Sequence, residues 1–550
     1  MGLLSDLSSA VRAHPLAALA LTHGASAAAL LWVLSGGRPL QLAYKLIFSS
    51  ALAVVPRALR EREQDKQRRG LEKTVIGDFL DGERRFPELP EAPMPRAEVL
   101  ALLERYAGKD AALWRTGQLS GAVYHGGDAL TDVMTEAFRR FALSNPLHPD
   151  VFPSVRKMEA ECVAMALRLF HGDAERGACG SMTSGGTESI LMAVKAYRDL
   201  ARAERGVTAP ELVVPVTAHA AFDKACHYFG VKLVHVAVDA KTFRADARAM
   251  CAAVNANTIA LVASAPSYPQ GVVDPVEELA AFARERGLPL HVDCCLGSFC
   301  IAFAARAGFP VSRRFDFAVE GVTSISCDTH KYGFAPKGSS VVLYSRRAFR
   351  DAQYFVAPEW TSGIYASPTI ARSRPGALIA ACWATMLSVG AEGYTDAARR
   401  VLAASRKIAD GVRAMPLLAL LGEPDLSVVC FSTAAGSGLN IYDVKDALGE
   451  RGWSLNTMQN PACVHLCVTY ANHASADKFL ADLAWAAAKV RAAPAGAAKG
   501  ESAAMYGLAA SIPDKSLIAQ VAMGYLDALT ACPREEGPAQ GGAAGGGAAS

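Results

Sequence analysis

Short apolar runs rich in β-branched residues alternate with helical patterns between about residues 143 and 347. We expect strands at residues 212–216, 233–238, 259–263, 288–292, 324–327 and 339–343. Most of these runs are apolar on both faces, as is typical of strands that helices cover on each side. The alternation predicts an α/β fold with a mostly parallel sheet, in which ligands bind beyond the carboxyl ends of the strands.

The remaining patterning sets the expected domain boundaries. Residues 57–142 begin charged and proline-spaced, and we interpret them as a linker and an N-terminal segment. Residues 143–393 form the predicted large domain, and residues 394–532 form a smaller C-terminal α+β domain. The tail, residues 533–550, is rich in glycine and alanine and poor in bulky apolar residues, so we expect it to be disordered.

Residues 1–56 contain an apolar run, 16–34, without lysine, arginine, aspartate or glutamate. Its length is close to the ~20 residues that cross a bilayer. A second apolar run, residues 40–56, is interrupted by Lys45, and arginines and lysines follow it from Arg57 onward, which favours a cytoplasmic location for the rest of the chain. We therefore expect an N-terminal membrane-anchor helix. The alternatives are a soluble helix pair packed on the body or on a second subunit and, less favoured, a cleaved signal peptide.

The composition argues against several classes of function. Lysine plus arginine (56) nearly balance aspartate plus glutamate (53), so the formal net charge is only +3. This charge gives no indication of a nucleic-acid-binding protein, which is usually strongly basic. The 13 cysteines are odd in number and include no Cys-x-x-Cys pair, which favours a reducing compartment over a disulfide framework. The histidines lack zinc-ligand spacing, and we expect no metal.

The segment at residues 183–189, Thr-Ser-Gly-Gly-Thr-Glu-Ser, precedes a long helical pattern. Gly185 and Gly186 let the backbone approach an anion, the hydroxyls of Ser184 and Thr187 can donate to it, and the helix N-terminus adds partial positive charge. This combination predicts a phosphate-binding loop. A glycine pair before a helix is more often only a turn, so the interpretation needs supporting features.

Two further polar residues follow predicted strands. His219 comes after the run at 212–216, where its imidazole could stack on a heteroaromatic ring, although a lone histidine there is usually structural. Asp293 follows the run at 288–292 and, once buried, needs a cationic partner such as a protonated pyridine nitrogen. The alternative for Asp293 is a cap on the next helix.

The segment at residues 328–333, Asp-Thr-His-Lys-Tyr-Gly, directly follows the predicted strand at 324–327. Lys331 can form a Schiff base where its surroundings lower its pKa, and His330 can donate to a phosphate oxygen. Most lysines after strands are merely solvated. A phosphate loop, a ring-stacking histidine, an aspartate and a lysine in this order, each at a predicted strand end, together indicate pyridoxal 5'-phosphate (PLP).

These residues resemble the group II PLP-dependent decarboxylases, and longer motifs are similar to the sphingosine-1-phosphate lyases among them. Those motifs lie at residues 120–124, 145–153, 334–340, 365–370, 373–376 and 459–461. The likeness covers about residues 99–471. It implies the aspartate-aminotransferase-like fold of PLP-dependent transferases (fold type I), with a smaller C-terminal α+β domain.

The resemblance also implies roles for particular residues. Lys331 carries the Schiff base, Asp293 holds the pyridine nitrogen and His219 stacks on the ring. The cofactor-binding set is completed by Ser184, Gly185, Gly186, Thr187 and His330, which hold the phosphate. Proton transfer is expected from Lys331, Lys337 and Tyr124, and substrate binding from Tyr124, Asn145, His148 and Lys337.

The implied reaction is cleavage of the C2–C3 bond of a phosphorylated sphingoid base to a long-chain aldehyde and phosphoethanolamine. The implied assembly is a homodimer with shared active sites, held at the endoplasmic reticulum membrane with its catalytic domain in the cytosol. Two alternatives stay open: an amino-acid decarboxylase on the same fold, and a membrane-tethered protein with this fold but no catalysis.

Overall fold

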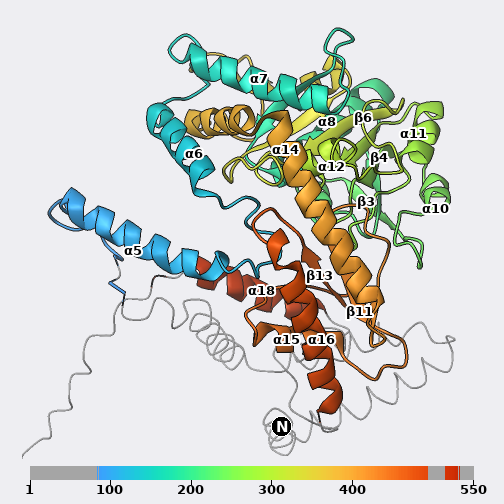
Figure 1. Ribbon diagram of the computed structural model, residues 1–550. Helices are drawn as coiled ribbons and strands as arrows, with labels where there is room; N and C mark the ends of the chain where they lie inside the picture. Colours follow the sequence, from blue (N-terminus) through green and yellow to red (C-terminus); the bar gives the residue numbers. More distant parts are fainter. Residues whose placement is uncertain (1–82, 85, 494–514, 531, 533–550) are drawn as a thin grey trace, which may run out of the picture. The chain divides into compact units, whose positions relative to one another are not determined.

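The computed structural model describes residues 83–84, 86–493, 515–530 and 532 (Figure 1). It divides into two compact units, Met1–Tyr106 with Ala504–Ser550, and Ala107–Ala503. The first unit holds α18 (Lys515–Thr530) and most of the first described helix, α5 (Arg96–Trp114). The predicted anchor at 1–56 and the predicted disordered tail at 533–550 lie outside the described residues.

The core of the second unit is a 7-stranded sheet of order β1-β7-β6-β5-β4-β2-β3. Its strands are β1 (Cys179–Thr183), β2 (Glu211–Pro215), β3 (Lys232–Val236), β4 (Thr258–Ser264), β5 (Leu290–Asp293), β6 (Val322–Cys327) and β7 (Ser340–Tyr344). Only β7 runs against its neighbours, β1 and β6. The mostly parallel sheet is confirmed, as are all the strands expected between residues 212 and 343. The strand β1 was not expected.

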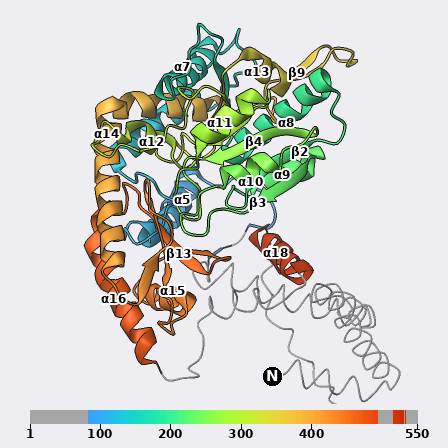
Figure 2. The ribbon, with the colours of Figure 1, turned by 90° about the vertical axis from the view of Figure 1, so that its right-hand side faces the viewer.

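Helices cover this sheet, which is why β2, β4 and β7 are buried along their whole length. The helices are α6 (Asp128–Phe141), α7 (Pro153–Leu169), α8 (Gly186–Arg205), α9 (Ala221–Phe229), α10 (Ala247–Ala252), α11 (Val276–Glu285), α12 (Ser298–Ala304) and α13 (Arg347–Gln353). The long helix α8 crosses β1, β4, β6 and β7, whereas α10 and α11 pack on β2, β4 and β5 (Figure 2). The side chains of Ile190, Val194 and Tyr197 on α8 are buried in the resulting core.

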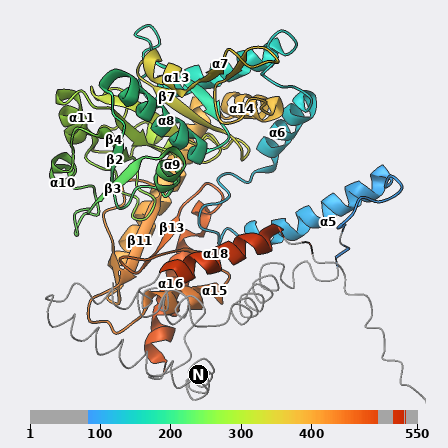
Figure 3. The ribbon, with the colours of Figure 1, turned by 180° about the vertical axis from the view of Figure 1, so that it is seen from behind.

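The C-terminal part is an α+β structure, as predicted (Figure 3). Its 4-stranded antiparallel sheet has the order β10-β11-β13-β12. Its elements are β10 (Leu418–Leu420), β11 (Val428–Thr433), α15 (Ile441–Gly449), β12 (Asn456–Met458), β13 (Cys463–Cys467), the short 3-10 helix η2 (His473–Ser475) and α16 (Ala476–Ala492).

The helix α14 (Gly376–Arg413) joins the two sheets. It breaks at Gly390, whose φ of 58° and ψ of 176° are not helical. The break lies three residues before the predicted domain boundary between 393 and 394. Within the described residues α14 is also the one helix long and apolar enough to cross a bilayer, but it packs against α6, α7, α12 and α16, and we interpret it as a core helix.

A small hairpin of β8 (Phe355–Ala357) and β9 (Tyr365–Ser367) stands apart from both sheets. Figure 2 shows it at the periphery of the large sheet, close to α13. Its large apolar side chains are exposed, and they include Phe355, Val356, Trp360 and Ile364. Large apolar side chains grouped in this way are uncommon on a solvent-exposed surface.

Candidate active site

The predicted site residues follow the carboxyl ends of four strands that run in the same direction. The loop after β1 leads to Gly185, His219 follows β2, Asp293 ends β5, and Lys331 follows β6. Parallel strands of one sheet end at the same edge, so the fold brings these residues together from positions far apart in the sequence.

The loop after β1 allows a very close backbone approach at Gly186. A Cβ atom on Gly186 would lie 2.7 Å from Oδ1 of Asp328 and 2.7 Å from Sγ of Cys295, closer than real Cβ contacts occur. Both Ser184 and Thr187 are exposed beside it, at the N-terminus of α8. The loop therefore presents the hydroxyl of Thr187 and the backbone N–H groups at the start of α8 to a ligand, whereas the N–H and hydroxyl of Ser184 already donate to Glu188.

Glu188, in the first turn of α8, fixes this loop. Its Oε2 accepts hydrogen bonds from the backbone N–H and the hydroxyl of Ser184, at 2.6 Å each. Its Oε1 accepts from the backbone N–H of Ile370 at 3.0 Å. Glu188 thus connects the predicted phosphate loop to the segment that follows β9.

We expect Gly186→Ala to weaken PLP binding by about tenfold or more, because the added methyl displaces Asp328 or the loop backbone, and small displacements in such sites have large effects. The dissociation constant, measured by titrating the visible absorption of the bound cofactor, tests this. Gly449→Ala is the matched control, since a Cβ at the end of α15 meets no atom within 4 Å. Unchanged affinity in Gly186→Ala would refute the close approach.

Lys331 lies beside a buried carboxylate. Its Nζ is 2.9 Å from Oδ2 of Asp328. Burial lowers the pKa of Lys331. The negative charge of Asp328 and, to a lesser extent, Cys295 and Tyr124 raise this pKa by more than burial lowers it, so the net shift is upward. In this state the amine is held as a cation, which must give up a proton before it can act as a nucleophile.

Asp328 itself has unused hydrogen-bonding capacity. Its Oδ1 is buried and has no hydrogen-bond partner among the described residues. His330 donates from Nδ1 to the carbonyl of Ser339 at 2.5 Å, which leaves its Nε2 3.6 Å from Oδ2 of Asp328. Because buried polar atoms are normally paired, this vacant oxygen indicates that a further group belongs beside the loop of Gly186.

Asp293 is held ionised with one oxygen available. Its Oδ1 accepts from the backbone N–H of Cys295 at 3.0 Å and from the hydroxyl of Ser326 at 3.1 Å, while no described residue bonds to Oδ2. Burial raises the pKa of Asp293, but His219, the Cys295 N–H and His291 together lower it below its ordinary value. A buried carboxylate of this kind can bind a cationic N–H.

His219 lies near this carboxylate with an exposed ring. Its Nδ1 accepts from the backbone N–H of Ala221 at 3.0 Å, so any ring proton is carried on Nε2. The ring also meets the ring of Tyr268 edge-on, with 6.5 Å between centroids. These contacts fix the imidazole plane, as stacking on a flat cofactor requires.

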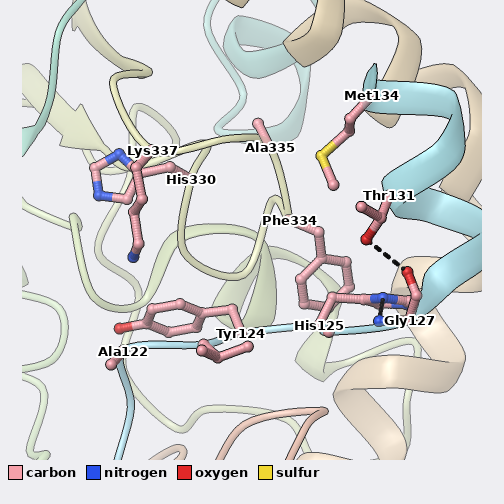
Figure 4. Close-up of a pocket in the computed structure, with 12 residues that line it drawn as sticks. Ala122, Tyr124, His125, Gly127, Thr131, Met134, His330, Phe334, Ala335 and Lys337 are labelled. Carbon is pink, nitrogen blue, oxygen red and sulfur yellow. Dashed lines mark hydrogen bonds between the residues drawn. The ribbon is translucent and has the colours of Figure 1, made fainter. Parts of the chain in front are cut away.

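A pocket of about 180 Å³ lies next to Lys331 and contains Tyr124, His330 and Lys337 (Figure 4). The Nζ of Lys337 lies 4.9 Å from the centroid of the Tyr124 ring. Burial and the neighbouring Lys331 lower the pKa of Lys337. Burial raises the pKa of Tyr124, so this phenol stays neutral at physiological pH. The pocket therefore combines a cation with a neutral hydroxyl donor.

The structure does not bring Asn145 and His148 into this pocket. Oδ1 of Asn145 accepts from the backbone N–H groups of Leu147 and Arg374, at 3.1 and 3.3 Å. His148 is exposed on the same turn. Their role toward the substrate stays a prediction, and within one subunit the visible role of Asn145 is to connect two loops.

Three residues that shape the site had no predicted role. Asp328 precedes Lys331 by three positions, which is a spacing for an ion pair within one turn and could have been noticed. Glu188 stands four residues after Ser184 at a helix start, a place where carboxylates cap backbone donors. Cys295 carries no such signal, because only the folded chain places its thiol against Gly186.

The residues present fit PLP. Gly186 permits close approach of a phosphate, the free Oδ2 of Asp293 suits a protonated pyridine nitrogen, and Lys331 supplies the amine. No group of three or more histidine, cysteine, aspartate or glutamate side chains that could hold a metal occurs among the described residues.

Comparisons with known proteins indicate the same cofactor. The profile of the pyridoxal-dependent decarboxylase conserved domain matches residues 124–434. The chain is 44% identical to sphingosine-1-phosphate lyase 1 of Mus musculus, over 85% of this chain and 81% of the relative. It is 42% identical to the sphingosine-1-phosphate lyase of Saccharomyces cerevisiae, over 85% and 79% respectively.

Solved structures give the same result at the level of the fold. The sphingosine-1-phosphate lyase of Burkholderia pseudomallei superposes with a TM-score of 0.75 at 38% identity, covering 83% of this chain and 100% of that one. A glutamate decarboxylase of Lactobacillus brevis has a TM-score of 0.65 at 18% identity, covering 76% and 99%. At that identity the second similarity concerns the fold alone.

Proposed function

This chain belongs to the sphingosine-1-phosphate lyases of the pyridoxal-dependent decarboxylase family, and on that premise we propose that it cleaves the C2–C3 bond of sphingosine 1-phosphate and other phosphorylated sphingoid bases. The products are a long-chain aldehyde and phosphoethanolamine. The observation that carries the proposal is the identity to lyases of animals and yeast over most of the chain, with the complete set of predicted cofactor residues at one sheet edge.

The cofactor is PLP, which when bound supplies an electron-withdrawing ring that takes up the electron pair of the breaking bond. We assign Lys331 to the covalent attachment and Asp293, through Oδ2, to the ring nitrogen. His219 would stack on the ring face. The phosphate is assigned to Ser184, Gly185, Gly186, Thr187 and His330; His330 can donate to it from Nε2 only as the imidazolium, because its Nδ1 proton is donated to the carbonyl of Ser339.

Two residues of the pocket are assigned to the substrate. Lys337 offers a cation to the phosphate of the substrate; to accept the proton of the C3 hydroxyl at Nζ it must first lose its own proton, which its lowered pKa favours. Tyr124, neutral and fixed under Lys337, can donate from its hydroxyl to either oxygen. Lys331 can hold a proton at its own Nζ and deliver it to C2 of the substrate.

An amino-acid decarboxylase is the second candidate, since such enzymes share the fold. A decarboxylase needs a cation for the substrate carboxylate, commonly an arginine. Among the described residues that line the pocket the only lysine or arginine is Lys337. A single flexible ammonium suits a terminal phosphate, although a planar carboxylate is matched better by a guanidinium.

A panel of substrates tests this assignment together with the role of Lys337. We expect Lys337→Met to raise KM for sphingosine 1-phosphate by about tenfold or more, because a charge-assisted contact to phosphate is lost. Unphosphorylated sphingosine should be a poor substrate for the parent and respond little to the substitution. Faster release of carbon dioxide from an amino acid than of aldehyde from the lipid would instead favour the decarboxylase.

The proposed assembly is a homodimer with shared active sites. Its support is the exposed apolar surface of the β8–β9 hairpin, where Ile364 is 71% exposed, and of the turn near Asn145, where Leu143 is 94% exposed. A partner that covers these surfaces would bring Asn145 and His148 toward a pocket other than that of their own subunit. The segment after β9, which Glu188 holds, would lie in the same interface.

We expect Phe355→Lys combined with Val356→Lys to convert the dimer to monomers, because two buried charges without partners would face the interface. Analytical ultracentrifugation measures the mass directly. Glu204→Lys, an exposed position on α8, serves as the control for added charge. A double variant that sediments like the parent would exclude the hairpin from the interface.

The proposed location is the endoplasmic reticulum membrane, with the catalytic domain facing the cytosol. The support is the apolar run at residues 16–34 and the free state of all the cysteines, as expected in a reducing compartment. Deletion of residues 1–56 should move the protein from the membrane fraction to the soluble fraction. Retention of the truncated chain on membranes would show that another segment binds them.

A further inference from the structure

A chain of buried hydrogen bonds leads from the helical core to Asp293. Tyr197 on α8 contacts Ser324 at 2.5 Å, and Ser324 contacts Nδ1 of His291 at 2.7 Å. Nε2 of His291 then lies 3.2 Å from the hydroxyl of Ser326, which is 3.1 Å from Oδ1 of Asp293. The side chains between the two ends are at most 1% exposed, so water does not compete with these bonds.

The ionised carboxylate sets the direction of every bond in this chain. Asp293 can only accept, so Ser326 donates to it and must itself accept from His291. His291 therefore carries its proton on Nε2 and accepts at Nδ1 from Ser324, which in turn accepts from the hydroxyl of Tyr197. Burial lowers the pKa of His291 to about 4, so the ring is neutral at physiological pH. All donors point toward Asp293.

We propose that Ser326 and His291 are positioning residues, which keep Asp293 ionised and turn its free Oδ2 toward the cofactor. The inference rests on the proposed PLP chemistry, in which Asp293 holds the ring nitrogen, and it deepens that function. Ser326 acts directly on Oδ1, and His291 acts through Ser326 by fixing the direction of its hydroxyl. Neither residue needs to touch the substrate.

The test measures the dissociation constant of PLP against pH for the parent and for Ser326→Ala. The groups that face Asp293 are His219 after β2, His291 on β5, and the thiols of Cys294 and Cys295. Loss of the Ser326 donor destabilises the carboxylate, so Asp293 takes up its proton at higher pH. As pH is lowered, we expect the affinity of Ser326→Ala for PLP to fall at a pH about one unit higher than in the parent.

Matched variants separate positioning from stability. Ser326→Thr keeps the hydroxyl and should restore the parent profile. Tyr197→Phe removes a hydroxyl from the far end of the hydrogen-bond chain. It should lower the unfolding temperature without changing the pH at which PLP affinity is lost on acidification (the acid limb of the profile). If Ser326→Ala does not fold, His291→Gln replaces it, because its amide holds Ser326 less firmly and should move the limb in the same direction.

An acid limb that stays in place in Ser326→Ala or His291→Gln, while the unfolding temperature falls, would overturn the proposal and leave a purely structural role. The measurement uses PLP alone and no sphingoid base. A protein that fails to cleave sphingosine 1-phosphate can therefore still show the shift, and the two hypotheses fail separately.

Discussion

Lys331→Ala is expected to abolish carbon–carbon cleavage, with a loss of about 10⁴-fold or more. No other described lysine lies at the sheet edge with its amine beside Asp328, and Lys337 points its Nζ over the Tyr124 ring instead. Borohydride reduction followed by peptide mapping reads the covalent attachment directly. The parent should yield a cofactor-labelled peptide that contains Lys331, and the variant should yield none.

Lys331→Arg is the matched control for this prediction. It keeps a cation beside Asp328, and hence the local ion pair, but it lacks a nucleophilic amine. The arginine variant should fold as stably as the parent and be as inactive as the alanine variant. Reductive labelling of another lysine in either variant would move the covalent attachment away from Lys331.

Asp293→Asn is expected to lower kcat by about 10²-fold or more, because the asparagine keeps the size and hydrogen bonds of Asp293 but removes the charge that holds the ring nitrogen protonated. Affinity for PLP should fall as well. Steady-state kinetics and a cofactor titration measure the two effects. Asp223→Asn, at an exposed position of α9, controls for the change of a single charge.

The pH dependence of Asp293 has a defined sign. The folded chain holds the pKa of this carboxyl below its ordinary value. Its ionisation therefore stabilises the fold at neutral pH, and this contribution is lost as pH falls from the ordinary pKa through the lowered one. In Asp293→Asn the contribution is absent at every pH, so the variant should lose less stability than the parent on acidification. An equal loss would show that Asp293 is not ionised in the folded chain.

The sequence predicted the large sheet well because its strands are apolar on both faces. The runs that became β2, β4 and β5 are buried residue by residue, and only strands between two helical layers have that composition. Strand β1 was not predicted because its sequence, Cys-Gly-Ser-Met-Thr, contains no apolar run. Its pairing with β7 is tertiary, and a Cβ on Gly180 would lie only 2.7 Å from the carbonyl of Val342.

The convergence of the predicted cofactor residues could be foreseen because parallel strands end at one edge, so polar residues that follow different strands meet there. The contacts among them could not. These contacts depend on the approach of segments that are distant in sequence. Examples are the group that Asp328 meets and the hydrogen bond from Ile370 to Glu188. Asn145 and His148 lie outside the pocket of their own chain, and the periodicity of the sequence does not encode that position either.

The central claim is lyase activity toward a phosphorylated sphingoid base, and product analysis with the purified full chain tests it most directly. The protein, loaded with PLP, is given sphingosine 1-phosphate, and aldehyde and phosphoethanolamine are quantified together. We predict that the two products appear in equal amounts from the parent and not from Lys331→Ala. A parent that binds PLP through Lys331 yet forms neither product would contradict the account and leave only the fold and the cofactor.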